Sequence, residues 1–333
     1  MDGKQLLLKH FQVEAERVPF QSKEICYESN GLLYHIIDAT DKEQQYLYEL
    51  HQMAQHMVRQ GEKRTAVFLR ARNGRFLVTE EERDFVVLVS SRPAPMRAFT
   101  GERLARFHLR GQSLLLQVQS ASELGSWRAS WEQRLEKIEK SANGLLKEQD
   151  DPFARLIVES FPYYMGLTEN ALQYVADTEI DEAPQQWDLG TICHRSFSEK
   201  SWLKEPAVHQ PFNWVFDYAA RDIAEWIRSE YWQGALFYRT RFIDFIRQYE
   251  QVRPLSPFAW RLIYARLLFP AHYFECIERY FAKGSLHIKK ENEEKLKKYL
   301  ANSREYEEFL AFFYDRAGVS SRRWNMPAIH WLK

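Results

Sequence analysis

Strand-like and helix-like hydrophobic patterns alternate in the first ninety residues. Short apolar runs flank two Asn-Gly pairs, Asn30-Gly31 and Asn73-Gly74, and Asn-Gly is a strong signal for a hairpin turn. Between the pairs, residues 42–60 place their apolar side chains on one face at helical spacing. The strands are expected at 25–27, 32–37, 66–69, 75–78 and 84–89. We therefore predict a small β-rich part that contains one helix.

The pattern beyond residue 99 is almost entirely helical. Pro270 lies inside the most apolar helix, and because proline cannot donate a helix hydrogen bond we expect it to kink that helix or end its first half. Only the stretch 186–216 is expected to be extended. The helices are expected at 100–112, 121–148, 152–175, 219–233, 235–250, 256–282 and 289–316.

The segment from Ser90 to Pro95 breaks both hydrophobic periods, and we place the domain boundary there. A chain of 333 residues exceeds the usual size of a single hydrophobic core. The predicted fold is α+β and two-lobed. We expect a small β-rich N-lobe with one helix at 1–91, a hinge at 92–98, and a large, mainly helical C-lobe at 99–333.

Composition narrows the classes of partner. Lys plus Arg and Asp plus Glu both total 46, so no overall field attracts nucleic acid, and we expect no nucleic-acid partner. The most apolar later stretch carries Arg261, Arg266 and Glu275, which predict a buried helix and no membrane insertion. Three scattered cysteines and the absence of a secretion signal indicate a reducing, cytoplasmic site of synthesis.

The segment from His194 to Leu203 has the spacing of a phosphotransferase loop. In such a loop His begins the turn, an Asp two residues later takes a proton from the attacking hydroxyl, and an Asn five residues beyond helps to hold Mg²⁺. Here those two positions are Ser196 and Ser201. A serine hydroxyl cannot act as a base near neutral pH and is a weaker metal ligand. We therefore expect phosphoryl transfer at this loop to be severely impaired.

Two more segments, 101–111 and 214–228, complete a pattern over nearly the whole chain. Together with the loop they resemble the aminoglycoside-phosphotransferase and choline-kinase-like superfamily. Within it, they resemble the spore-coat-associated CotS and YutH group of Bacillus-type bacteria. The resemblance implies a protein-kinase-like fold, synthesis in the mother-cell cytoplasm, and a place in the spore coat with other coat proteins as partners.

The resemblance also implies a second metal-binding Asp after the loop, and the matched position is Asn213. No catalytic residue is therefore expected at the degenerate positions His194, Ser196, Ser201 and Asn213, and no metal site is expected. His194 is more simply a scaffold residue that hydrogen-bonds backbone.

Asp217 and Asp222 are the rescue candidates if metal binding survives. Asp217 is the acid we would choose first. Asp222 is better explained as a cap of the helix expected to start at Ile223, because its carboxylate can accept backbone N–H bonds there.

Parts of the N-lobe are altered as well. The only glycines before residue 38 are Gly3 and Gly31, so no glycine-rich loop cradles phosphates. The strand after Gly31 has no Lys, and the nearest one is Lys42. Glu43 and Glu49 are candidates for the helix Glu of a kinase, but no partner for either is evident.

These losses favour a catalytically degenerate kinase-like protein that is a structural or docking component of the spore coat, with no cofactor expected. The alternative is an active, ATP- and Mg²⁺-dependent phosphotransferase that acts on a small hydroxyl-bearing molecule through Asp217 or Asp222. A third hypothesis is nucleotide binding without turnover. The first hypothesis depends on one expectation, that acidic oxygens do not gather within reach of one metal ion in the cleft.

Overall fold

The structure, a computed structural model, describes residues 2–18, 26–95, 98–145, 151–203, 207–234, 240–282, 286–324, 326–327, 329 and 331–332. They form two compact units. The first comprises Met1–Glu123, Leu189–Ser229 and Arg247–Pro254, and the second Leu124–Asp188, Glu230–Ile246 and Leu255–Lys333. The hinge expected at 92–98 stays a prediction, because residues 96 and 97 lie outside the described residues.

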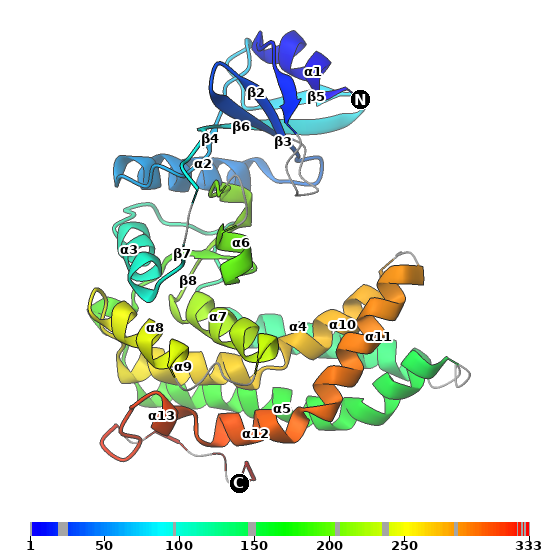
Figure 1. Cartoon of the computed structure of the whole chain (residues 1–333), viewed down its shortest axis with the longest axis vertical. Coiled ribbons are helices and arrows are strands. Elements are labelled where there is room, and N and C mark those ends of the chain that lie inside the picture. The colour runs from blue at the N-terminus through cyan, green and yellow to red at the C-terminus, as the bar shows by residue number, and fades with distance from the viewer. Residues whose placement is uncertain are drawn as a thin grey trace. The chain divides into compact units, whose positions relative to one another are not determined.

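A six-stranded antiparallel sheet lies in the N-terminal part of the first unit (Figure 1). Its strands are β1 (Glu16–Val18), β2 (Cys26–Ser29), β3 (Leu32–Asp38), β4 (Val67–Phe68), β5 (Leu77–Glu80) and β6 (Arg83–Ser91). They run in the order β1-β2-β3-β6-β4, and β5 pairs with a separate stretch of β6.

The first predicted hairpin turn is confirmed. Ser29 and Leu32 face each other across it, and the φ angles of Asn30 and Gly31, 50° and 74°, are those that a tight two-residue hairpin requires. The second predicted hairpin is wrong, because β4 and β5 pair with β6 and not with each other. The Asn73-Gly74 pair still turns the chain between them.

Helical segments cover this sheet. A helix not expected from the sequence, α1 (Gly3–Leu6), continues into a π-helical turn at Leu7–Phe11, and Leu6 and Leu7 share a core cluster with Tyr27, Tyr34 and Phe85 of the sheet. The predicted helix at 42–60 is confirmed as α2 (Gln44–Arg59), which lies against β4.

A second, two-stranded sheet lies in the same unit. It pairs β7 (Thr191–His194) with β8 (Trp214–Asp217), and the short helix α6 (Glu199–Leu203) lies in the connection. Helix α3 (Gly101–Gln112) packs against β7. At Gly111 a Cβ atom would lie 2.6 Å from Thr191 Oγ1 and 2.7 Å from Ile192 N, so this close approach requires glycine.

Helices make up most of the second unit. They are α4 (Trp127–Leu145), α5 (Pro152–Asp181), α9 (Pro257–Leu268), α10 (Ala271–Phe281), α11 (Leu286–Ala301), α12 (Ser303–Ala311) and α13 (Phe313–Arg316), while α7 (Ala220–Gln233) and α8 (Arg241–Glu250) each span both units. Pro270 separates α9 from α10 as predicted.

Two helix predictions need correction. The single helix expected at 289–316 is wrong, since the chain breaks at Asn302 and Phe312 into α11, α12 and α13. The helix expected at 235–250 begins at Arg241, and residues 235–239 lie outside the described residues. Across the described part of the chain, none of the helices combines the length and the apolar character that a membrane span needs.

Candidate functional site

His194 ends strand β7 and is held in place by aromatic rings. The centroid of its ring lies 5.0 Å from that of Phe107, 5.0 Å from that of Phe197 and 5.1 Å from that of Trp202. Ser196, which the loop spacing matches to the catalytic base, is exposed on the loop that follows. The loop is therefore fixed by packing, and it presents a hydroxyl where a phosphotransferase has a carboxylate.

Ser201 takes part in a local helix cap. Its Oγ accepts a hydrogen bond from the backbone N–H of Ser198 at 3.0 Å, and Ser198 Oγ accepts one from the backbone N–H of Ser201 at 3.1 Å. Ser201 Oγ also donates to the carbonyl of Ser198. This reciprocal arrangement satisfies backbone groups at the start of α6. At the position matched to the metal-binding Asn, the side chain is thus engaged in holding the helix.

Asp222 is completely buried and joins the loop to α3. Its Oδ1 accepts the backbone N–H of His194 at 2.9 Å, and its Oδ2 lies 2.6 Å from His194 Nδ1 and 3.2 Å from His108 Nε2. The expectation that Asp222 caps a helix starting at Ile223 is wrong, because α7 begins at Ala220 and Asp222 lies inside its first turn. The carboxylate anchors His194 through both its ring and its backbone, as a scaffold role requires.

The protonation of this cluster follows from its burial. Burial by itself would raise the pKa of Asp222, but His194 and His108 hold it well below its ordinary value. Burial lowers the pKa of His108 to about 4, and Asp222 opposes that shift. At neutral pH Asp222 is therefore ionised and His108 is neutral. The ionised carboxylate of Asp222 therefore holds the loop at His194 through charge-assisted hydrogen bonds.

His108 and Asp222 lie near Cys193, and one ligand atom from each of the three falls within 4.8 Å of the others. The atoms do not fit a metal centre. Both ring nitrogens of His108 have partners, Asp222 and the hydroxyl of Tyr249. Burial raises the pKa of the Cys193 thiol well above its ordinary value, and this thiol lies 3.3 Å from the carbonyl of Tyr218. A thiol that stays protonated is a poor metal ligand.

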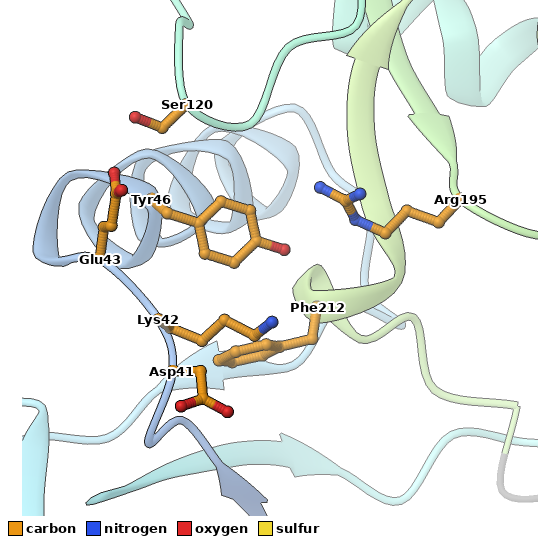
Figure 2. A pocket seen from close by; sticks show the side chains of 7 residues that line it. All are labelled: Asp41, Lys42, Glu43, Tyr46, Ser120, Arg195 and Phe212. Carbon is orange, nitrogen blue, oxygen red and sulfur yellow. The ribbon is translucent and has the colours of Figure 1, made fainter. Parts of the chain in front are cut away.

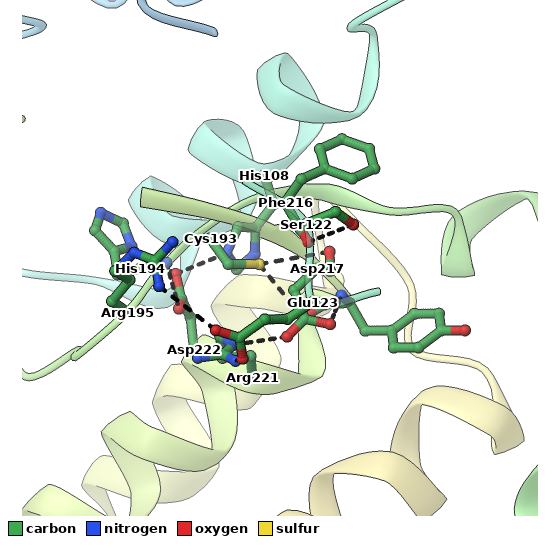
Figure 3. A network of polar contacts seen from close by, with 11 residues as sticks. His108, Ser122, Glu123, Cys193, His194, Arg195, Phe216, Asp217, Arg221 and Asp222 are labelled. Atoms are coloured by element: carbon green, nitrogen blue, oxygen red, sulfur yellow. Dashed lines mark hydrogen bonds and ion pairs between the residues drawn. The ribbon is translucent and has the colours of Figure 1, made fainter. Parts of the chain in front are cut away.

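Asp217 ends strand β8 and belongs to a network of polar contacts with Arg221 and Glu123 (Figure 3). It too is completely buried. Its Oδ1 accepts the backbone N–H of Tyr218 at 2.7 Å, and its Oδ2 accepts Arg221 Nε at 2.6 Å. Another nitrogen of the same guanidinium, Nη2, pairs with Glu123, which also lies 3.6 Å from Arg195. Asp217 and Glu123 therefore do gather around one cation, while the expectation that no acids gather around a metal ion in the cleft stays a prediction. The cation that they share is Arg221.

The charges of this network balance within the protein. Burial by itself would lower the pKa of Arg221, but Asp217 and Glu123 raise it above its ordinary value. Arg221 stays charged at any pH at which the protein is folded. Two carboxylates and two guanidinium groups leave no net charge to attract a metal ion.

Asn213 lies at the opposite end of β8 from Asp217. Its side chain is exposed, and its backbone carbonyl accepts the N–H of Arg195 at 2.8 Å. Asp217, and not Asn213, therefore belongs to the buried network around Arg221.

Glu49 on α2 has partners that sequence reasoning missed. Its carboxylate accepts the backbone N–H groups of Ala121 at 2.7 Å and Gln119 at 3.1 Å, and the side chain of Gln45 at 2.9 Å. Burial opposes these bonds, yet they lower the pKa of Glu49. This candidate for the helix Glu thus binds backbone N–H groups, whereas an active kinase pairs its helix Glu with a strand Lys.

A pocket of about 460 Å³ borders this region in the first unit (Figure 2). Arg195 lies over the ring of Tyr46, with its guanidinium carbon 5.6 Å from the ring centroid. The pocket mixes acidic, basic, hydroxyl and aromatic side chains, so it can bind a small polar molecule. It is lined by Asp41, Lys42, Glu43, Tyr46, Ser120, Arg195 and Phe212.

Comparison with known proteins gives one family and one fold. The family model described as "Spore coat putative kinase YutH" matches residues 4–313. The endospore coat-associated protein YutH of Bacillus subtilis (strain 168) is 34% identical over 309 residues, which are 92% of this chain and 91% of that protein.

Two solved structures share the architecture. An aminoglycoside phosphotransferase from Alicyclobacillus acidocaldarius matches with a TM-score of 0.66 at 15% identity, covering 91% of this chain and 92% of that one. An AMP-bound spectinomycin phosphotransferase matches with a TM-score of 0.58 at 12% identity, covering 89% and 93%. These likenesses confirm the predicted α+β, kinase-like fold.

Proposed function

The chain belongs to the YutH family of kinase-like spore coat proteins, and from this premise we propose that it is a spore coat component that keeps a kinase fold without transferring phosphate. Its relative in Bacillus subtilis is described as endospore coat-associated, which supports the location. Its role is then structural, as a component on which other coat proteins dock.

The observation that carries this proposal is the ion pair between Arg221 and Asp217. Phosphoryl transfer requires Mg²⁺ to neutralise the charge that develops on the phosphates. Asp217 and Glu123 are the acids that could hold such an ion, but both already bind Arg221. The residues present therefore do not fit a metal ion as they are arranged.

The proton acceptor is missing as well. Ser196 stands where a carboxylate would take the proton of an acceptor hydroxyl, and a neutral serine cannot do so near pH 7. Ser201 is engaged in its cap, and Glu49 holds backbone. Specific contacts support the loss at Ser201 and Glu49, and the residue type supports it at Ser196.

One observation favours the alternative, an active phosphotransferase with atypical site residues. Glu123 and Asp217 do converge, so a movement of Arg221 away from them would leave two acids able to hold a cation. This alternative requires that the loss of either carboxylate abolishes a measurable activity.

A variant test in spores separates the two functions. A fluorescent fusion of the chain is expressed in a spore-forming host that lacks its own copy, beside Glu123→Gln and Ser196→Ala. The control is Glu14→Gln, which removes an exposed carboxylate in the same unit and outside the pocket. We expect all of them to assemble on the coat equally. Loss of assembly in Glu123→Gln, with unchanged thermal stability, would show that the acidic site is needed and would contradict the proposal.

A further inference from the structure

We propose that Arg221 is the resident cation of a closed metal site, and that a neutral side chain at this position opens a site for Mg²⁺ or Mn²⁺ between Asp217 and Glu123. This inference rests on the proposed function and deepens it. It explains how a fold that uses metal-bound phosphates can keep converging acids and still not bind a metal ion.

Geometry supports the exchange of one cation for the other. Asp217 and Glu123 bind Nε and Nη2 of Arg221, two nitrogens fixed side by side in one rigid planar group. A hard divalent cation lies about 2.0–2.6 Å from each oxygen ligand, so it bridges oxygens within roughly 5 Å of each other. Oxygens that contact neighbouring nitrogens of one guanidinium are held close to this spacing.

Burial supplies the driving force. Asp217 is completely buried, and Arg221 is the cation that its Oδ2 contacts. Without that charge, the buried carboxylate of Asp217 loses its compensating guanidinium, and this favours the binding of another cation in its place. A divalent ion in this place would also contact Glu123, whose side chain is 33% exposed, so ions can reach it from solvent.

The charged groups around the site set the expected affinity. Arg195 lies 3.6 Å from Glu123 and remains after Arg221 is replaced, so it weakens metal binding without preventing it. Asp222 is engaged by His194 and His108 and is not expected to be a ligand. Replacing Arg195 as well should therefore tighten metal binding further.

Four full-length proteins test the proposal: the unmodified chain, Arg221→Met, Arg221→Lys, and Arg221→Met with Glu123→Gln. Binding of Mn²⁺ is followed by the loss of its free-ion electron paramagnetic resonance signal, and thermal stability is measured with and without MnCl₂ at matched ionic strength. Arg221→Met should bind Mn²⁺ at least tenfold more tightly than the unmodified chain. Arg221→Lys and the double variant should return to the behaviour of the unmodified chain.

The proposal is overturned if folded Arg221→Met binds Mn²⁺ no better than the unmodified chain, or if the double variant binds equally well. If Arg221→Met is unfolded without metal, the proposal requires saturating Mn²⁺ to restore its folding, and a chain that stays unfolded rejects it. If the unmodified chain transfers no phosphate and Arg221→Met does not bind metal, this inference is wrong but the proposed function stands. Phosphate transfer by the unmodified chain defeats the proposed function itself.

Discussion

Arg221 donates from Nε to Oδ2 of Asp217 across 2.6 Å, at a point where the carboxylate is completely buried and the arginine nearly so. Within a turn of the same helix, Asp222 accepts hydrogen bonds that hold the loop at His194. Two acids that follow the loop at His194 thus bind groups of the protein itself. In an active phosphotransferase such acids hold metal ions or orient the catalytic loop.

Arg221→Ala should destabilise the protein strongly, because it leaves Asp217 as a buried charge without its cation. Breaking a buried pair from one side costs about 3–5 kcal/mol in the free energy of unfolding. Arg106→Ala is the matched control, since it breaks an exposed pair with Glu102 on one helix, and should cost less than about 1 kcal/mol. Urea unfolding at neutral pH measures both. Equal losses in the two variants would show that the buried pair contributes nothing special.

Adding Asp217→Asn to Arg221→Ala should recover part of the lost stability, because it removes the uncompensated charge. The double variant is expected to be more stable than Arg221→Ala alone by about 1 kcal/mol or more. A double-mutant cycle from the same unfolding curves gives this coupling. Simple additivity would mean that the two side chains do not interact.

Gly111→Ala should cost about 1–3 kcal/mol, because the added methyl group would collide with the backbone and side chains of β7. Gly144→Ala is the control, since it lies in helix α4 and a Cβ there meets nothing within 4 Å. That change should be neutral or stabilise by up to about 1 kcal/mol. Thermal unfolding of the two variants compares them directly. A tolerated alanine at 111 would disprove the close packing of α3 on β7.

Acid should weaken the fold through His108. The ring takes up a proton at about pH 6.5 in the unfolded chain but only near pH 4 in the folded protein. The unfolded state therefore binds more protons between these values, and stability falls as the pH drops from about 6.5 to 4, by about 3 kcal/mol from this residue. In His108→Gln, urea unfolding across this range should show a shallower loss. An unchanged slope would show that His108 is not buried as a neutral ring.

Local sequence signals predicted much of the fold. The Asn30-Gly31 turn and the break at Pro270 depend on the backbone preferences of those residues alone, and both are confirmed. The second Asn-Gly pair led to a wrong prediction of strand pairing. Strand partners depend on contacts across the whole sheet, and β4 and β5 both pair with β6.

Only the part of the site that lies within one short segment of the sequence could be predicted. The loop residues at 196 and 201 can be found from spacing alone. Glu123 could not be found in this way, because it lies 98 residues from Arg221 along the chain, and no local pattern distinguishes it from the other acids of the sequence. The role of Asp222 was misjudged because α7 starts at Ala220, a shift of a few residues that turns a capping position into an internal one.

Release of phosphate from ATP by the purified chain tests the central claim most directly. The reaction contains MgCl₂ and a panel of small hydroxyl acceptors, and Asp217→Asn is measured in parallel with its thermal stability. The account predicts no release or transfer above the protein-free rate, and no difference between the two proteins. Mg²⁺-dependent turnover by the unmodified chain that disappears in a folded Asp217→Asn variant would contradict it.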